Sequence, residues 1–319
     1  MTPRAHVIAG PTASGKSAVA QLLAERHGLR ILSADSMLVY RGMDIGTAKP
    51  SASERGRVIY AGLDLATPGE PFNTALYLQA VARELSAPGW DRPFLLTGGT
   101  GLYIKSLLHG FDPPDAPDPA LRAELDDLHA REGVPGLRAR LAAIDPQALA
   151  TLADPGNPRR LIRAIEIAGR TDARPRSWAI PVEILPILGL AVAPDLLAVR
   201  IARRVDRMFD DGLLEETARL RAEFPLWSPT ALQAIGYAEA AAVLDGALSQ
   251  DVARERIAAR TRQLAKRQRT WLRNQEQVDW LEVPADIPVE ELADRVWARL
   301  QQTGPHDLKL PAAPGAHSH

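Results

Sequence analysis

Residues 6–20, HVIAGPTASGKSAVA, decide the fold of this chain. They place Gly10, Gly15, Lys16 and Ser17 in the spacing G-x-x-x-x-G-K-S, between an apolar run and a helix-forming run. Glycines at both ends let successive backbone N–H groups turn toward an anion, and the following helix adds the positive end of its dipole. Lys16 then reaches the outer phosphate, and Ser17 offers a hydroxyl to Mg²⁺. The pattern predicts a strand, a loop that binds a di- or triphosphate, and a helix; a turn that binds nothing would not need all eight residues.

Apolar runs that alternate with helical segments predict a parallel sheet. A helix over 14–27 joins the first strand to the second, and a Gly-Gly-Thr-Gly turn joins the strand that ends at Thr97 to a helix beginning near Leu102. Pro186 interrupts the last apolar segment, which we therefore expect at an edge of the sheet or at a bulge. The expected strands are residues 6–10, 30–33, 93–97 and 182–192. The fold class is α/β: a parallel sheet that contains a P-loop and is flanked by helices.

A proline-rich acidic segment at residues 111–119 separates this α/β pattern from a purely helical one. Helical patterns follow over 120–131, 136–144, 146–153 and 158–168, with no strand signal among them. We expect an all-helical insertion at 113–177, which divides the α/β core into 1–112 and 178–302. Helices are expected over 196–274, followed by a short strand near Trp280. Residues 303–319, rich in Pro, Gly, Ala and His, predict a disordered tail.

Composition excludes several classes of chemistry. The chain has no cysteine, so it forms no disulfide and offers no thiolate to a reaction or a metal. Its seven histidines show no metal-ligand spacing. No apolar run approaches the roughly 20 residues of a membrane span, and the N-terminus lacks the pattern of a secretion signal. We therefore expect a soluble cytoplasmic protein that does not bind membranes.

Acidic residues are scarce beside the expected phosphate loop. Proteins that hydrolyse nucleotides on such a loop commonly carry an Asp that holds Mg²⁺ at the end of a neighbouring strand. Here that strand closes on Thr97, which disfavours an ordinary motor ATPase. The nearest acid is Asp35, just past the second strand and, in a parallel sheet, at the same edge as the loop. Asp35 is either a functional carboxylate or an N-cap of the next turn, and the residues alone do not separate the two.

Basic residues cluster between positions 254 and 273, where eight cations accompany one Glu. On a helix, four of them form a basic stripe about 60° wide: Arg262, Lys266, Arg269 and Arg273. The side opposite, which we expect to pack in the core, carries Ile257, Leu264 and Trp271. The basic stripe faces outward, either as a solvated surface or, because aligned cations repel one another, as a surface for a polyanion.

A second basic group lies in the helical insertion. It consists of Arg159, Arg160 and Arg163. Anion contact and a plain surface helix are equally compatible with these residues. The net charge of −1 conceals both groups, because acids elsewhere in the chain balance them.

Seven segments together resemble the bacterial tRNA dimethylallyltransferase family, over most of the chain from about residue 6 to residue 280. The first segment is shared with many phosphate-binding families, and the other six are far more specific. The segments are GPTASGKS (10–17), SADSMLVYRGMDIGTAKP (33–50), LLTGGTGLYIKSLLHGF (95–111), NPRRLIRAIEI (157–167), RIARRVDRMFDDGLLEE (200–216), ALQAIGYAEA (231–240) and TRQLAKRQRTWLR (261–273).

The resemblance implies transfer of a dimethylallyl group from dimethylallyl diphosphate to N6 of the adenosine 3′-adjacent to the anticodon, with release of diphosphate. It also implies Mg²⁺, held by Ser17, and a helical insertion that closes over the anticodon stem-loop of tRNA. A pyrophosphate leaving group suits a phosphate loop that has no water-activating acid, because the bond that breaks joins carbon to oxygen. We expect a monomer whose partners are tRNA and dimethylallyl diphosphate.

The same resemblance assigns roles to individual residues. Asp35 is the general base for the adenine amine, Thr100 lies near the reacting nucleotide, and Lys16 stabilises the leaving diphosphate. The implied diphosphate-binding residues are Gly10, Pro11, Thr12, Ala13, Ser14, Gly15, Lys16, Ser17 and Arg200. The implied tRNA-binding residues are Asp35, Ser36, Met37, Leu38, Thr100, Arg159, Arg160, Leu161, Ile162, Arg163, Lys266, Arg269 and Arg273.

The chain departs from the family pattern at three places. Leu38 stands where the family usually carries Gln, so an amide hydrogen bond to the adenine edge is lost or replaced. Tyr60-Ala61 stands in place of a His-His pair, and Asn157-Pro158 in place of Asn-Asp.

Two other classes of protein share the phosphate loop and stay open as alternative functions. A small-molecule kinase has no need of aligned arginines, and a non-catalytic RNA-binding ATPase has no need of a base at Asp35.

Overall fold

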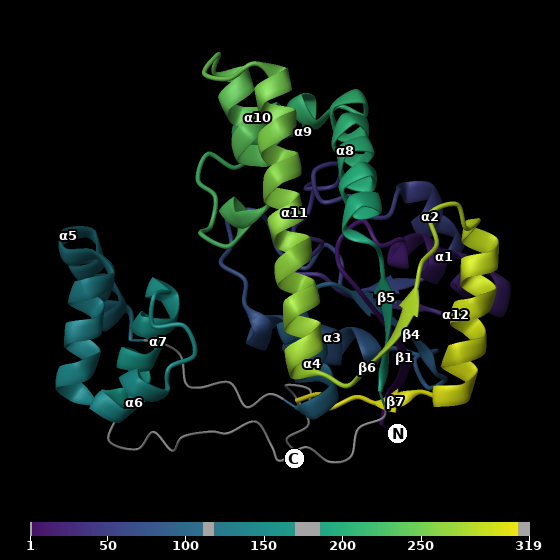
Figure 1. Ribbon diagram of the computed structural model, residues 1–319, viewed down its shortest axis with the longest axis horizontal. Coiled ribbons are helices and arrows are strands. Elements are labelled where there is room, and N and C mark those ends of the chain that lie inside the picture. The colour runs from purple at the N-terminus through teal and green to yellow at the C-terminus, as the bar shows by residue number, and fades with distance from the viewer. Residues whose placement is uncertain (1, 111–117, 170–185, 312–319) are drawn as a thin grey trace. The chain divides into compact units, whose positions relative to one another are not determined.

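The computed structural model describes residues 2–110, 118–169 and 186–311 (Figure 1). The chain divides into two compact units, a larger one from residues 1–111 and 181–319 and a smaller one from residues 112–180. The smaller unit therefore interrupts the larger one in sequence, close to the expected boundaries at 113 and 177. Each unit has a hydrophobic core of its own.

A parallel sheet forms the centre of the larger unit, in the order β3-β2-β4-β1-β5-β6. β1 lies between β4 and β5 and runs parallel to both, so the strand before the phosphate loop is central. The short β7 pairs antiparallel with β1. The strands are β1 (Arg4–Ala9), β2 (Ile31–Ala34), β3 (Tyr60–Ala61), β4 (Phe94–Gly98), β5 (Ile187–Ala191), β6 (Val278–Glu282) and β7 (His306–Asp307). The expected α/β fold with a parallel sheet is confirmed.

Helices cover both faces of the sheet (Figure 1). α1 and α12 pack together on one face, and α3 and α4 pack together on the other. α8 to α11 extend beyond the carboxyl ends of the strands. The helices are α1 (Lys16–His27), α2 (Ala52–Arg57), α3 (Thr74–Leu85), α4 (Gly101–His109), α8 (Pro194–Asp210), α9 (Leu213–Glu223), α10 (Tyr237–Leu244), α11 (Gln250–Gln275) and α12 (Val289–Thr303).

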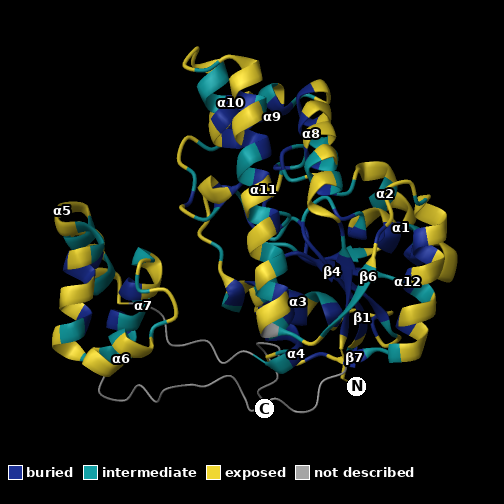
Figure 2. Ribbon diagram, viewed as in Figure 1, coloured by how far each residue is buried: buried dark blue, intermediate teal, exposed yellow. Residues whose placement is uncertain are grey.

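The core of the larger unit lies between the sheet and these helices (Figure 2). The central strands are short apolar runs buried on both faces, as is typical of parallel sheets. On the α3 and α4 side, the rings of Tyr77 and Tyr103 stack with centroids 3.8 Å apart. The Tyr77 hydroxyl donates to Ser33 O at 2.7 Å. This contact fixes the end of β2, which leads directly to Asp35.

Two expectations are wrong in the larger unit. β5 is not at an edge, because β6 pairs with it in parallel along its whole length; Pro186 is tolerated because it lies just before the strand, outside the hydrogen-bonded ladder. The first part of the expected disordered tail is ordered. His306 pairs with Ala5 in the sheet, and Leu308 is buried in the core. Residues 312–319 lie outside the described residues.

The described part of the smaller unit consists of helices: α5 (Pro119–Ile144), α6 (Pro146–Thr151) and α7 (Pro158–Ala168). α5 is kinked at Gly133, whose φ of 65° is left-handed, so that two expected helices form one broken helix. α5 and α7 pack around buried Leu125, Leu137, Leu141, Leu161, Ile162 and Ile165. The expected helices of the insertion are confirmed.

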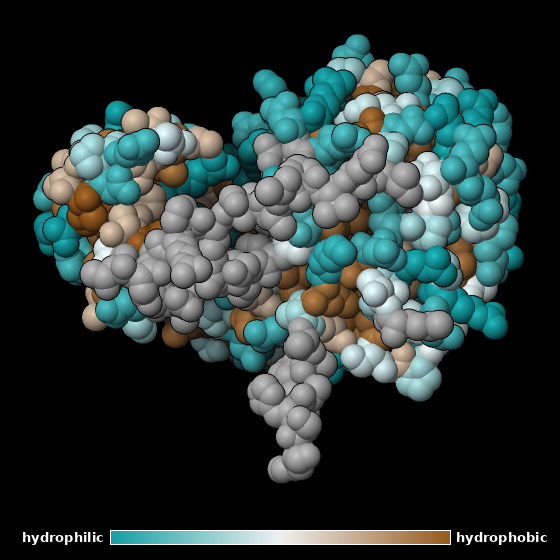
Figure 3. Space-filling model, turned by 90° about the horizontal axis from the view of Figure 1, so that it is seen from below, coloured by the Kyte–Doolittle hydropathy of each residue, from teal (hydrophilic) through white to brown (hydrophobic). Residues whose placement is uncertain are grey.

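None of the helices in the described ranges is long and apolar enough to cross a membrane. On the uncovered part of the face in Figure 3, hydrophobic residues appear in small groups among polar ones. Leu226, in the loop between α9 and α10, is 85 % exposed and has the largest exposed fraction among the described large hydrophobic side chains.

Candidate active site

The phosphate loop joins β1 to α1, at the edge where the parallel strands end. Gly15 adopts a left-handed φ of 97° directly before the first residue of α1. Lys16 folds back over the loop, and its Nζ donates to Pro11 O at 3.1 Å. Burial lowers the pKa of Lys16 to about 8, and the negative charge of Asp35 partly opposes this shift. The loop is therefore preformed around one buried cation.

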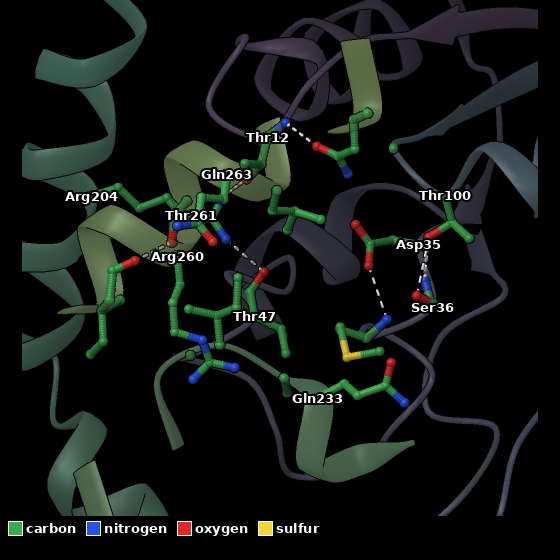
Figure 4. Close-up of a pocket in the computed structure, with 18 of the residues that line it drawn as sticks. Thr12, Asp35, Ser36, Thr47, Thr100, Arg204, Gln233, Arg260, Thr261 and Gln263 are labelled. Carbon is green, nitrogen blue, oxygen red and sulfur yellow. Dashed lines mark hydrogen bonds between the residues drawn. The ribbon is translucent and has the colours of Figure 1, made fainter. Parts of the chain in front are cut away.

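Three cavities adjoin this loop. The outer cavity has a volume of about 1180 Å³, and Lys16, Ser17, Arg200 and Arg204 are among the residues that line it. The large cavity has a volume of about 560 Å³ and the small cavity a volume of about 50 Å³. Four residues line both: Thr12, Asp35, Thr47 and Arg204. In Figure 4, Asp35 and Thr100 lie on one side of the large cavity, and Arg204 and Arg260 lie on the other. A carboxylate and a guanidinium therefore stand where the two cavities join.

Asp35 follows β2 and forms the capping interaction that its sequence position leaves open; its role as a functional carboxylate stays a prediction. Its Oδ1 accepts from the Met37 N–H at 2.9 Å, which is a capping interaction. Its Oδ2 has no hydrogen-bond partner among the described residues. Beside it, Thr100 Oγ1 accepts from the Ser36 N–H at 2.9 Å and lies 3.2 Å from Ser36 Oγ. Asp35 thus caps its turn with one oxygen and presents the other to a ligand.

Arg204, on α8, lines both the large and the small cavity. Its Nη1 donates to Thr12 Oγ1 and its Nη2 to Thr47 O, both at 3.0 Å. Its Nε is buried and unpartnered among the described residues, and burial lowers the pKa of the guanidinium. Arg200, one turn earlier on α8, donates to Ser14 O at 3.3 Å and lines the outer cavity beside Lys16 and Ser17. The resemblance assigns diphosphate binding to Arg200, and that assignment stays a prediction.

α11 lies directly against the phosphate loop. Gln268 Oε1 accepts from the Thr12 N–H at 2.8 Å. The helix also approaches the Gly-Gly-Thr-Gly turn so closely that a Cβ at Gly99 would lie 2.3 Å from Gln268 Nε2. A Cβ at Gly101 would lie 2.1 Å from the ring of Trp271. Both glycines are therefore needed for α11 to close this side of the site.

The basic stripe of α11 points away from the two cavities. None of its four residues lines either cavity, and the residues of α11 that do lie on the other side of the helix. Arg273 instead lies over the ring of Trp280, 5.8 Å from its centroid. The outward orientation that the sequence predicts is confirmed, because Arg262, Lys266 and Arg273 are exposed.

The side of α11 that the sequence assigns to the core contributes to the cavity as well. Ile257 is buried, and Trp271 packs half-buried against the core, which confirms that expectation. Ile257 and Leu264 also line the large cavity, together with Arg260 and Arg267. Arg260 pairs with Glu239 at 2.5 Å.

The smaller unit contains five of the residues that the resemblance assigns to tRNA binding: Arg159, Arg160, Leu161, Ile162 and Arg163. Leu161 and Ile162 are buried in the core of that unit, so their side chains hold its helices together. Arg163 forms an ion pair at 2.9 Å with Glu166, which is itself buried. Arg159 and Arg160 are exposed. Of the five, these two arginines are the ones with exposed side chains.

Hydroxyl groups surround the small cavity. Ser17, Ser33 and Thr97 line it, and the Thr97 hydroxyl is buried without a partner among the described residues. Leu38 and Tyr60, two departures from the family pattern, line it too. No three His, Cys, Asp or Glu side chains in the described ranges are grouped to hold a metal. A cation here would depend on hydroxyls and on phosphate oxygens, which suits Mg²⁺.

Sequence reasoning missed several residues that line the cavities. Arg204 follows Arg200 by one helical turn, and charge alone does not say which of the two faces inward. Thr47 lies in a segment that carries the family resemblance, yet no role followed from its residue type. The missed cavity residues are Thr47, Arg204, Gln233, Arg260, Arg267 and Gln268. Two of them, Gln268 and Arg260, could have been found, because a polar residue on the apolar side of a helix suggests a polar partner or a cavity there.

Comparisons with known proteins identify the family of the chain. The sequence profile of the family described as "IPP transferase" matches residues 38–275, and that of "Isopentenyl transferase" matches residues 3–60. The tRNA dimethylallyltransferase of Anaeromyxobacter sp. (strain K) is 45% identical over 301 residues, covering 92% of this chain and 97% of the relative. The tRNA dimethylallyltransferase of Geobacter sulfurreducens is 42% identical over 291 residues, covering 88% of this chain and 92% of the relative.

A solved structure of a related transferase has a similar fold. The full-length tRNA isopentenylpyrophosphate transferase from Bacillus halodurans superimposes with a TM-score of 0.64 at 36% sequence identity. The match covers 94% of this chain and 98% of that protein. By sequence and by fold, the chain belongs to the tRNA dimethylallyltransferase family.

Proposed function

We propose that this chain transfers a dimethylallyl group from dimethylallyl diphosphate to N6 of the adenosine 3′-adjacent to the anticodon of tRNA, releasing diphosphate. The junction of the two cavities carries this proposal, because Asp35 lies there with Lys16 and Arg204 around it. A carboxylate suits a nucleophile that must lose a proton, and two cations suit an anionic leaving group.

The leaving group departs into the phosphate loop. The C1–O bond of the donor breaks, and its electron pair goes to the diphosphate. Lys16, Arg204 and the loop N–H groups stabilise the charge that develops there, more strongly than in water because the cations are buried. Ser17 and the diphosphate oxygens would hold Mg²⁺, which would supply further charge stabilisation to the leaving group.

The nucleophile approaches from the large cavity. The N6 nitrogen forms the new bond to C1 and loses one proton, which Asp35 Oδ2 accepts. A carboxylate is a weak base toward a neutral amine, so it takes the proton as the N–C bond forms and the nitrogen becomes acidic. The capping bond from Met37 holds Asp35 in place for this step. The base must leave its stack to arrive here, which suits a loop nucleotide.

The anticodon stem-loop supplies phosphates for the remaining cations. Arg267 lines the large cavity, where the extruded nucleotide enters. The exposed Arg159 and Arg160 belong to the smaller unit, and the basic stripe of α11 does not line that cavity. We assign them to the phosphate backbone, where contacts add affinity without reading sequence.

One transfer experiment tests the reaction. The purified protein is incubated with Mg²⁺, labelled dimethylallyl diphosphate and unmodified tRNA that carries adenosine 3′ of the anticodon. Labelled ATP serves as a parallel donor. We expect label in the RNA from the allylic diphosphate and none from ATP. Consumption of ATP without prenyl transfer would contradict the proposal and favour a kinase.

A further inference from the structure

A buried carboxylate outside the two cavities has no cationic partner among the described residues. Glu216, on α9, is 5 % exposed, and no described Lys or Arg forms a salt bridge with it. Its oxygens accept from the N–H groups of Asp44 at 3.1 Å, Ile45 at 3.0 Å and Gly46 at 3.3 Å. Its Oε1 also accepts from the Tyr237 hydroxyl at 2.7 Å. Four neutral donors therefore compensate a charge whose burial is otherwise unfavourable.

The three N–H groups belong to one loop, residues 44–47, which lies between β2 and α2. Consecutive N–H groups that point at one anion form a nest, and here the protein fills the nest with its own carboxylate. Tyr237 packs on the same loop, because a Cβ at Gly46 would lie 2.6 Å from its ring. The conformation of this loop therefore depends on α9 and α10.

The loop ends at a residue of the site. Thr47 lines both cavities, and its carbonyl oxygen accepts from Arg204 Nη2 at 3.0 Å. The other terminal nitrogen, Nη1, donates to Thr12 in the phosphate loop. The position of the guanidinium thus depends on where the loop places the Thr47 carbonyl.

We propose that Glu216 is a positioning residue for diphosphate binding. Together with Tyr237 it fixes the loop 44–47, and the loop in turn holds Arg204 against the phosphate loop. Glu216 itself lines neither cavity, so it acts through these contacts. The inference rests on the proposed function, in which the phosphate loop binds a diphosphate.

Glu216→Gln tests this inference. The variant keeps the shape of the side chain but replaces one acceptor oxygen with an NH₂ group, which cannot accept from the loop N–H groups. We expect the KM for dimethylallyl diphosphate and the Kd for inorganic pyrophosphate to rise about 10- to 100-fold, because small displacements of a binding group have effects of this size. The KM for tRNA should stay within about twofold. Glu215→Gln, the exposed neighbour, is the matched control and should match the wild type.

The outcomes separate a positioning role from a purely structural one. If Glu216→Gln lowers the melting temperature but leaves the Kd for pyrophosphate unchanged, Glu216 is structural and the inference is wrong. If that variant does not fold, Tyr237→Phe removes one donor while the carboxylate stays, and its Kd for pyrophosphate should rise about threefold or more. An unchanged Kd in Tyr237→Phe would overturn the inference. An inactive wild type that still binds pyrophosphate would instead refute the proposed reaction.

Discussion

Arg204→Gln should weaken diphosphate binding and prenyl transfer far more than Arg200→Gln does. The two Nη groups of Arg204 hold Thr12 and Thr47, and its buried Nε is unpartnered among the described residues. Arg200 makes one contact of 3.3 Å with Ser14 O and lines the outer cavity. The two arginines lie one turn apart on the same helix, so each serves as the control for the other.

The expected magnitudes follow from these environments. Loss of a preorganised donor that faces developing charge costs about 2.7–4 kcal/mol, and a hydrogen bond to a charged group contributes about 1.5–3 kcal/mol. A value of about 3 kcal/mol corresponds to a fall of roughly 150-fold in kcat/KM for Arg204→Gln. A half-exposed charge contributes about 0–1 kcal/mol, so Arg200→Gln should lower kcat/KM by no more than about fivefold.

The assay is prenyl transfer at varied concentrations of dimethylallyl diphosphate, together with calorimetric binding of inorganic pyrophosphate. Urea unfolding of each variant verifies that the protein is folded at the assay temperature. The reasoning is refuted if Arg200→Gln shows the loss of about two orders of magnitude and Arg204→Gln stays within threefold. In that case the diphosphate would lie in the outer cavity, which Arg200 lines beside Lys16 and Ser17.

Four further predictions concern other residues. Asp35→Asn should lower the transfer rate about 10²- to 10⁴-fold and leave tRNA affinity in filter binding unchanged, since a general base is lost; an equal loss of tRNA binding would make Asp35 a contact residue. Pyrophosphate binding should weaken as the pH rises through about 8, where the buried Lys16 loses its proton, and calorimetry of Lys16→Met should lack this pH dependence. Burial lowers the pKa of His306 to about 4, so as the pH falls the unfolded chain binds a proton before the folded chain does. The free energy of unfolding should therefore fall by about 3 kcal/mol between pH 6.5 and pH 4. Urea unfolding of His306→Phe should show a smaller fall over the same range. Arg269→Ala should reduce the slope of the logarithm of the tRNA binding constant against the logarithm of the salt concentration by about one. An unchanged slope would mean that Arg269 is a solvated surface residue that does not contact a phosphate.

Local patterns in the sequence predict most of the fold. The phosphate loop is specified by eight adjacent residues, and the strand before it and the helix after it follow from the same stretch. The insertion is visible because a proline-rich acidic segment precedes helices without strands. These features depend on neighbouring residues, which is why a single sequence is sufficient to find them.

The sequence does not reveal which distant segments pair with one another. Pro186 suggests an edge, but β6, whose residues 278–282 follow much later in the chain, covers that side of β5. In the same way His306, in a segment whose composition predicts disorder, completes the sheet beside β1. Both differences arise because composition and periodicity describe a segment, whereas the partner that buries it comes from elsewhere.

The two sides of α11 show why charge alone does not locate a cavity. Cations without nearby acids are most stable where water solvates them, so the basic stripe faces outward. A cation that lines a cavity needs compensation, and Arg260 has it in Glu239. The cavity side therefore alternates apolar and polar residues, and Gln268 contacts the phosphate loop through Thr12. Substitution of Gln268 should consequently change pyrophosphate affinity at constant salt, whereas substitution in the basic stripe should change only the salt-dependent binding of RNA.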